Sequence, residues 1–220
     1  YDDFNKSGDN YTLKANVPHF AGETNTQPGM PKYRDINGDG VIDDNDCTII
    51  GNGLPVHTGG FTNNFAYAGF DLSVFFQWSY GNDILNANRL WFESSWNKSR
   101  DLNQFASYAD RWTPENPTSD IPRATASASN KVFSSRIIED GSFLRLKTVT
   151  LGYTLPKAIV THLHIDNLRV YFAAQNLFTI TSYSGYDPEV SIRNNALTPG
   201  LDFSAYPRAR QFSFGVHLGF

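Results

Sequence analysis

The sequence predicts an all-β fold: a transmembrane antiparallel β-barrel, of which this chain is a C-terminal fragment with about five spanning strands and long extracellular loops. Three observations lead to this prediction. Several segments alternate between apolar and polar residues, as strands do when one face meets lipid and the other meets water. Aromatic residues make up 15% of the 220 residues and charged residues only 18%. Long polar segments separate the alternating ones, and such loops are uncommon in compact soluble domains.

The first two predicted strands, residues 57–67 and 70–80, form a β-hairpin. From Phe70 the even-numbered positions of the second strand are apolar or aromatic, namely Leu72, Val74, Phe76, Trp78 and Tyr80. The odd-numbered positions are polar apart from Phe75, and this period of two is typical of a strand with two different faces. A short turn at Ala68-Gly69 joins the two strands.

Two further strands are predicted at residues 143–155 and 167–179. Val149, Leu151, Tyr153 and Leu155 share one face of the first, opposite a face rich in threonine. Its beginning breaks the pattern, because Arg145 and Lys147 fall on the apolar face. A β-bulge, or a strand end that projects above the membrane, would explain this break.

The fifth predicted strand, residues 208–220, has the clearest alternation in the chain. One face carries Phe212, Phe214, Val216, Leu218 and Phe220, and the other carries polar residues and glycines. A tilted strand of about 9–11 residues is long enough to cross a bilayer.

The lengths of the connections predict the orientation of the strands. The Ala68-Gly69 turn is short, whereas the connections 81–142 and 180–207 are long, and in bacterial barrels short turns are periplasmic and long loops extracellular. The C-terminus is then periplasmic, and residues 1–56 are an extracellular loop region before the strands of residues 57–220.

Residues 84–96 could hold a short helix, and residues 132–139 are loop or strand extension rather than a sixth crossing. Five strands cannot close a barrel, and the chain starts at Tyr1, so we expect missing N-terminal strands.

Residues 35–46 follow the pattern of a twelve-residue calcium loop. Side-chain oxygens occur at its positions 1, 3, 5 and 9, a glycine at position 6, and a backbone carbonyl would serve at position 7. The candidate ligands are Asp35, Asn37, Asp39, Val41, Asp43 and Asp46. Asp46 stands where the EF-hand has a bidentate glutamate. In this it resembles loops of the dockerin type, which have an aspartate at that position. The alternative is an Asx-rich turn without metal. A structural calcium ion is thus the one cofactor that the sequence suggests.

Other classes of function find little support. The net charge is −4 with scattered basic residues, which argues against nucleic-acid binding. Several acidic residues, from Glu93 to Glu189, lie in predicted loops without a catalytic motif around them, so we predict that the chain is not an enzyme. Three tryptophans, Trp91, Trp96 and Trp112, could stack on a sugar; equally, they could pack within their own loop.

From about residue 31 to the C-terminus, the sequence resembles SusC/RagA-type TonB-linked outer-membrane proteins. The resemblance is carried, in this order, by DINGDGVIDDNDCTIIGNGLP, GGFTNNFAYAGFDLSVFFQWSYGNDILNANR, RWTPENPTSDIPRA, DGSFLRLKTVTLGYTLP, LRVYFAAQNLFTITSYSGYDPEVS and YPRARQFSFGVHLGF. It implies a large plugged barrel of the outer membrane that imports glycans or peptides with energy from TonB, usually capped by a SusD-like surface lipoprotein. The plug and the TonB-contacting segment would belong to the missing N-terminal part. The terminal strand ending on Phe220 resembles the signal that the barrel-assembly machinery reads.

Two alternatives remain at this point. The chain could be a soluble, calcium-stabilised β-sandwich that binds carbohydrate, although a sandwich would have turns every 8–12 residues or so. It could also belong to a TonB-dependent receptor for siderophores or vitamins.

Overall fold

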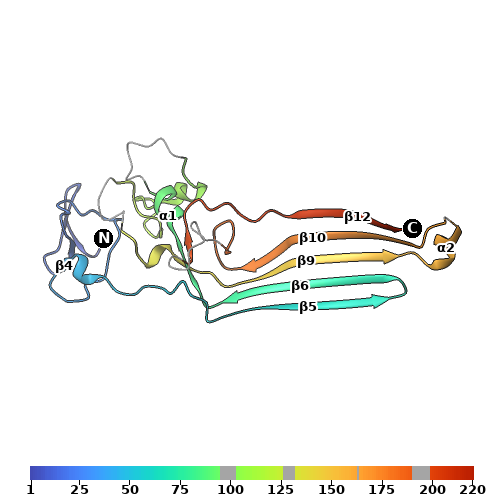
Figure 1. Ribbon diagram of the computed structural model, residues 1–220. Helices are drawn as coiled ribbons and strands as arrows, with labels where there is room; N and C mark the ends of the chain where they lie inside the picture. Colours follow the sequence, from blue (N-terminus) through green and yellow to red (C-terminus); the bar gives the residue numbers. More distant parts are fainter. Residues whose placement is uncertain (95–102, 126–131, 163, 190–198) are drawn as a thin grey trace. The chain divides into compact units, whose positions relative to one another are not determined.

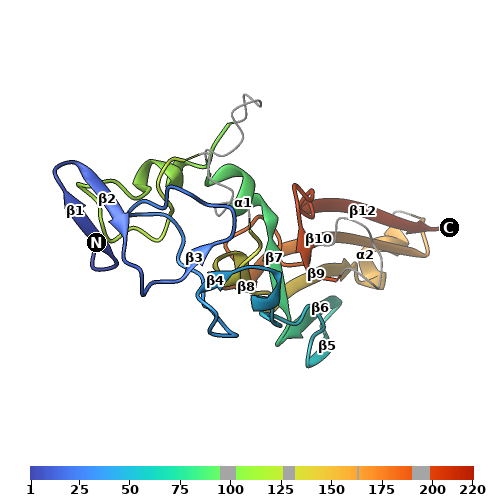
Figure 2. The ribbon, with the colours of Figure 1, turned by 90° about the vertical axis from the view of Figure 1, so that its left-hand side faces the viewer.

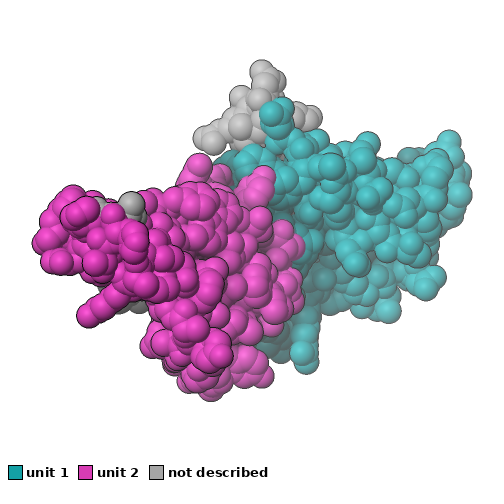
Figure 3. Space-filling model, turned by 90° about the vertical axis from the view of Figure 1, so that its right-hand side faces the viewer, with its two compact units in different colours: residues 1–51, 86–138 teal, residues 52–85, 139–220 magenta. Residues whose placement is uncertain are grey.

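The computed structural model describes all residues except 95–102, 126–131, 163 and 190–198 (Figure 1). The chain divides into two compact units (Figure 3), one of residues 1–51 and 86–138, the other of residues 52–85 and 139–220. No helix in the described part of the chain is long and apolar enough to cross a membrane.

The second unit is built on one five-stranded antiparallel sheet. Its strands, in spatial order, are β12 (Gln211–Gly219), β10 (Asn167–Thr181), β9 (Phe143–Thr154), β6 (Phe70–Tyr80) and β5 (His57–Tyr67). The five predicted strands are therefore confirmed, although β12 begins three residues later than predicted. Because all five lie in one sheet, this unit does not have the two packed sheets of the sandwich alternative.

The Ala68-Gly69 turn is confirmed as a two-residue hairpin connection. Both residues have positive φ, 50° and 87°, as the type I′ turn of tight hairpins requires. Gly69 is also required sterically, because a Cβ there would lie 2.7 Å from the carbonyl oxygen of Thr154. Helix α2 (Lys157–His162) and the C-terminus lie at the same end of the sheet as this turn (Figure 1).

Replacing Ala68 with asparagine should stabilise the hairpin. Alanine is strained at positive φ, whereas asparagine adopts this conformation readily and forms the preferred Asn-Gly turn. We expect the free energy of unfolding to rise by about 0.5–1 kcal/mol. Denaturant unfolding of the full-length protein would measure it, with Ala66→Asn, in the adjoining strand, as the control that should bring no gain.

A bulge accounts for the broken alternation at the start of β9. Thr148 pairs with Phe75 but Leu146 pairs with Phe76, so Lys147 is an extra residue on β9 relative to β6. This shift places Arg145 opposite Gln77 on the polar face and returns Leu146 to the apolar face. The predicted bulge is confirmed.

Besides α2, this unit contains most of a small sheet of β11 (Leu201–Asp202), β7 (Asp83–Asn86) and β8 (Ile138–Asp140). Residues 132–139 contain a whole 3-10 helix (Ser135–Ile137) and the first two residues of β8. As predicted, they do not form a sixth long strand.

The first unit has little regular structure, and Figure 2 shows its N-terminal hairpin. The predicted loop region of residues 1–56 also contains four short strands: β1 (Phe4–Ser7), β2 (Asn10–Leu13), β3 (His19–Phe20) and β4 (Val41–Ile42). Strands of two to four residues are too short to show a period of two, so the sequence pattern misses them. The predicted short helix is α1 (Ala87–Phe92). Three 3-10 helices among the described residues also belong to this unit: Asp44–Asp46, Ala106–Asp110 and Ser135–Ile137.

Candidate functional site

The five-stranded sheet has one apolar face that is widely exposed. Phe65, Phe70, Phe214 and Val216 are 59%, 52%, 82% and 66% exposed, although side chains of this kind are usually buried in soluble proteins. The same face carries further exposed residues on every strand of the sheet, namely Phe61, Tyr67, Tyr80, Leu144, Leu151, Val170, Phe178, Ile180, Phe212 and Leu218. A continuous apolar surface of this extent marks contact with another apolar phase.

Aromatic side chains gather at both ends of this apolar face. Near the Ala68-Gly69 turn, the rings of Phe70 and Tyr153 lie 4.4 Å apart. At the other end, the ring of His57 stacks on Tyr80 at 5.1 Å and accepts a hydrogen bond of 3.1 Å from the indole N–H of Trp78. Rings with a polar edge at both ends of an apolar band are typical of strands that cross a bilayer.

The opposite face of the sheet is polar and carries an ion pair across three strands. Arg169 on β10 donates to both carboxylate oxygens of Asp71 on β6, at 3.0 and 2.6 Å. Between them lies Gly152 of β9, where a Cβ would approach the guanidinium and the carboxylate to 2.4 Å. The absence of a side chain at Gly152 therefore makes room for this pair.

A second charged cluster lies at the end of the polar face away from the Ala68-Gly69 turn. Arg145, only 2% exposed, donates to the hydroxyl of Thr179 at 2.9 Å, to Glu189 at 3.0 Å, and to Asp187. Asp187 also accepts from the backbone N–H groups of Glu189 and Arg208, both at 2.9 Å. One buried carboxylate thus holds together the strand β9 and both ends of the segment between Asp187 and Arg208.

Glu189 extends the same cluster toward the surface. Its carboxylate lies 2.9 Å from Lys147 and 3.0 Å from Nε of Arg208. The bulge residue Lys147 therefore also forms an ion pair with Glu189, which the broken alternation alone did not indicate.

The pKa of Asp187 is lowered from its usual value. Burial alone would raise it, but the hydrogen bonds from Arg145 and from the N–H groups of Arg208 and Glu189 outweigh burial. A carboxylate whose pKa is lower in the folded state stabilises the fold above its unfolded pKa, about 3.9, and loses this contribution as the pH falls.

We therefore expect the free energy of unfolding to decrease as the pH is lowered from about 5 to 3, around the unfolded pKa of aspartate. Urea unfolding at a series of pH values would measure this. The amide of the Asp187→Asn variant does not titrate, so the free energy of unfolding of this variant should fall less steeply as the pH is lowered. A variant with an unchanged pH dependence would contradict the assignment of this contribution to Asp187.

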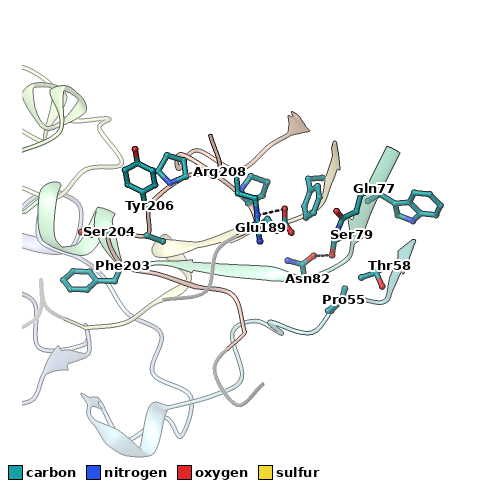
Figure 4. A pocket seen from close by; sticks show the side chains of 15 residues that line it. Pro55, Thr58, Gln77, Ser79, Asn82, Glu189, Phe203, Ser204, Tyr206 and Arg208 are labelled. Carbon is teal, nitrogen blue, oxygen red and sulfur yellow. Dashed lines mark hydrogen bonds and ion pairs between the residues drawn. The ribbon is translucent and has the colours of Figure 1, made fainter. Parts of the chain in front are cut away.

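Next to this cluster lies a pocket of about 950 Å³ (Figure 4), formed within the second unit. Gln77 and Ser79 of β6 line it from the sheet, and Asn82 lies beside them, accepting a hydrogen bond of 2.7 Å from Ser79. Residues 203–208 and Pro188-Glu189 supply the other wall. The volume falls within the roughly 300–1,000 Å³ of small-molecule sites.

In the first unit, residues 35–46 form a tight loop closed by its own hydrogen bonds. Asp35 accepts from the N–H groups of Gly38 and Gly40 at 2.6 and 2.9 Å. Asp46 accepts from Ile36 at 2.7 Å and from Asp43 at 2.9 Å, and these bonds lower its pKa. The other predicted ligands lie in the same loop: Asn37 and Asp39 accept from backbone N–H groups two residues on, Asp43 caps the 3-10 helix, and Val41 lies in β4.

This loop has the curvature of the predicted calcium loop, with Gly40 at a φ of +86°. Within the described residues, however, no group of three or more His, Cys, Asp and Glu side chains is placed to hold a metal ion. The carboxylates are turned toward backbone N–H groups, so an ion would have to draw their oxygen atoms together.

The three candidate tryptophans do not form one site. Trp112 is half-buried, with its ring 5.8 Å from Tyr1 and beneath the guanidinium of Arg123 at 5.6 Å. A Cβ on Gly29 would lie 2.2 Å from this ring, so the glycine allows the close packing. Trp91 belongs to α1, and Trp96 lies outside the described residues.

The known proteins to which this chain is similar have names of one kind: they are TonB-dependent receptors or importers. No family model matches the chain. It is 36% identical over 89% of its length to TonB-dependent receptor P3 of Formosa agariphila, and 28% identical over 90% to TonB-dependent receptor SusC of Bacteroides thetaiotaomicron. A solved structure of the RagAB peptide importer in its 'closed-closed' state matches 87% of the chain and 21% of that chain, with a TM-score of 0.69 and 28% identity.

A second solved structure, of the RagAB peptide transporter, covers 74% of the chain and 17% of that chain, with a TM-score of 0.63 and 31% identity. The chain belongs to the TonB-dependent receptors of the SusC/RagA type. It spans about a fifth of the length of the curated relatives, 19% of receptor P3 and 18% of SusC.

The similar proteins are receptors and importers by name rather than enzymes, in agreement with the sequence prediction. Two acidic residues of this receptor segment, Glu93 and Glu139, have structural partners. Glu93 pairs with Arg89 at 3.0 Å and Arg136 at 2.7 Å, and Glu139 accepts from the hydroxyl and N–H of Ser184.

Sequence reasoning missed both charged clusters on the polar face of the receptor segment. Alternation places Asp71 and Arg169 on polar faces but does not reveal that β9 lies between their strands. For Arg145 the pattern even indicated the wrong face, because the bulge at Lys147 changes the phase of the alternation.

Proposed function

We propose that this chain is part of the wall of an outer-membrane β-barrel that imports oligosaccharides or peptides with energy from TonB. TonB-dependent receptors reside in the outer membrane, and the family relationship supports this location. The single observation that carries the proposal is the five-stranded sheet, which has one exposed apolar face with aromatic rings at both ends and one polar, charged face. In a barrel wall, the first face would meet lipid and the second the lumen.

In this proposal, the Ala68-Gly69 turn, α2 and the C-terminus are periplasmic. The connections 81–142 and 180–207, with residues 1–56, are extracellular. A SusD-like lipoprotein would cap this outer side, and the TonB complex would act through a part of the protein outside this chain. The alternating residues Phe212, Phe214, Val216, Leu218 and Phe220, all 43% exposed or more, would present the signal for barrel assembly.

The proposal is tested on the full-length receptor in its own bacterium. We expect the protein in the outer-membrane fraction, with a gel mobility that shifts on boiling. Deleting its gene should abolish uptake of either oligosaccharides or peptides, and complementation should restore uptake only when TonB is functional. A protein that fractionates as soluble, or one whose deletion affects only cobalamin or ferric-siderophore uptake, would contradict the proposal.

We further propose that residues 35–46 bind calcium weakly, with a Kd of about 0.1–1 mM, as extracellular calcium modules do. The spacing of Asp35, Asn37 and Asp39 supports this, together with the glycine turn at Gly40. We expect terbium to bind the purified receptor, with luminescence sensitised through nearby aromatic rings, and calcium to displace it. The variant Asp39→Ala should weaken terbium binding, whereas Asp9→Ala, outside the loop, should not. Equal binding by both variants would exclude the loop as the site.

A further inference from the structure

An amide side chain interrupts the apolar face of the five-stranded sheet. The pairing of the strands places Asn63 of β5 on this face, in a row across the sheet with Val74, Val149, Ala174 and Phe212. Asn63 lies in the interior of β5, whose ends are His57 and Tyr67. The aromatic rings therefore lie on either side of this row, and in the proposed barrel wall Asn63 is near the middle of the bilayer.

The surroundings of Asn63 on this face are apolar. Its neighbours are Phe61 and Phe65 along β5 and Val74 across on β6, and it is half-buried among them. Among the described residues its amide has no hydrogen-bond partner. An amide without a partner is costly in hydrocarbon, where no water replaces the missing hydrogen bond. The remaining neighbouring position lies on the other side of β5, beyond the edge of the sheet.

A bilayer requires that this edge of β5 be paired. Within the described residues β5 pairs with β6 alone, and hydrocarbon cannot satisfy the backbone groups of an open strand edge. Each long strand of this sheet pairs with the next long strand in the sequence. The missing neighbour is therefore the spanning strand before β5. Because residues 1–56 hold strands of two to four residues only, this strand belongs to a part of the receptor outside the chain.

We propose that Asn63 forms a hydrogen bond, inside the bilayer, with a polar side chain on the lipid face of that preceding strand. Side chains opposite each other on neighbouring strands have Cβ atoms about 4.5–5.5 Å apart, which is within hydrogen-bond reach. The inference rests on the proposed barrel wall and adds to it a contact that fixes the register of β5. Any shift in register would leave the amide unpaired, as it does for buried asparagines in coiled coils.

The first test compares guanidinium unfolding midpoints of the full-length receptor in lipid vesicles. Asn63→Leu should lower the midpoint, because the facing side chain loses its partner. An amide without a partner would give the opposite sign, since leucine is the more favourable side chain in hydrocarbon. Val149→Asn is the matched control, because it adds an amide to the same row between Val74 and Ala174. Its midpoint should fall, which shows that an unpaired amide is costly at this depth.

The second test locates the partner by cross-linking. In a cysteine-free receptor, with Cys47→Ser in this chain, Asn63→Cys is combined with one cysteine at each lipid-facing position of the preceding strand in turn. A short bifunctional thiol reagent is added, and a protease then cuts at a site inserted at Gly8, in the exposed turn between β1 and β2. The two pieces should stay joined on a denaturing gel for the position that faces Asn63.

The native residue at that position should have a hydrogen-bonding side chain. Replacing it with leucine in the Asn63→Leu receptor should lower the midpoint no further, because the two residues act as one pair. An apolar residue at that position would contradict the inference.

Two further outcomes would overturn the inference while the proposed barrel wall stands. One is a midpoint of Asn63→Leu that stays the same or rises while that of Val149→Asn falls. The other is a covalent dimer formed by Asn63→Cys alone, which would assign the contact to a second copy of the receptor. A Val149→Asn receptor as stable as wild type would instead contradict the proposed barrel wall itself.

Discussion

Replacing Phe214 with arginine should destabilise the full-length receptor in lipid by about 2–4 kcal/mol, the range measured for cations at the midplane on the lipid face of barrels. Phe214 lies in the middle of β12 and is 82% exposed on the apolar face. In a bilayer this exposure means contact with hydrocarbon, where a guanidinium loses its hydration. Guanidinium unfolding of the receptor in lipid vesicles, followed by tryptophan fluorescence, would measure the difference.

Ser213→Arg is the matched control, because Ser213 is adjacent to Phe214 on the same strand but belongs to the polar face. We expect less than about 1 kcal/mol for this change, because the side chain stays in water. The ratio of the two effects reports the environment of each face. If the Phe214 variant were as stable as wild type, the apolar face would not meet lipid. That result would contradict the proposal that this sheet is part of a barrel wall.

The second large effect is expected for Asp187→Ala, which should lower the free energy of unfolding by about 3 kcal/mol, as removal of one partner of a buried pair does. Arg145 would remain 2% exposed with Glu189 as its remaining carboxylate partner among the described residues. The N–H groups of Glu189 and Arg208 would also lose their acceptor. Denaturant unfolding measures the change, and the fraction of heat-modifiable protein in the outer membrane reports whether assembly suffers.

Two comparisons make this prediction specific. Asp187→Asn keeps an oxygen acceptor but not the charge, so its effect should be smaller than that of alanine. Glu115→Ala removes an exposed carboxylate in the first unit and should change stability little. An Asp187→Ala variant that unfolds with wild-type stability would show that Glu189 alone compensates Arg145.

The strands of the second unit could be predicted because their two faces meet different surroundings. Phe70 to Tyr80 and Gln211 to Phe220 alternate so regularly that their bounds could be predicted to within three residues. The turn at Ala68-Gly69 could be predicted for the same reason, since alternation stops there and resumes. The short strands β1 to β4 could not, because pairing rather than local pattern defines a strand of two to four residues.

The sequence by itself determined that this chain forms long two-faced strands, and its resemblance to a family determined the kind of protein. Both inferences depend on the sequence of residues within short stretches of the chain. The tertiary structure decided which residues of different strands meet. The spatial order β6, β9, β10 brings Asp71 to Arg169 over Gly152, and the bulge at Lys147 turns Arg145 toward Asp187. Such contacts join residues 42 or 98 positions apart, so they depend on strand order and register rather than on local sequence.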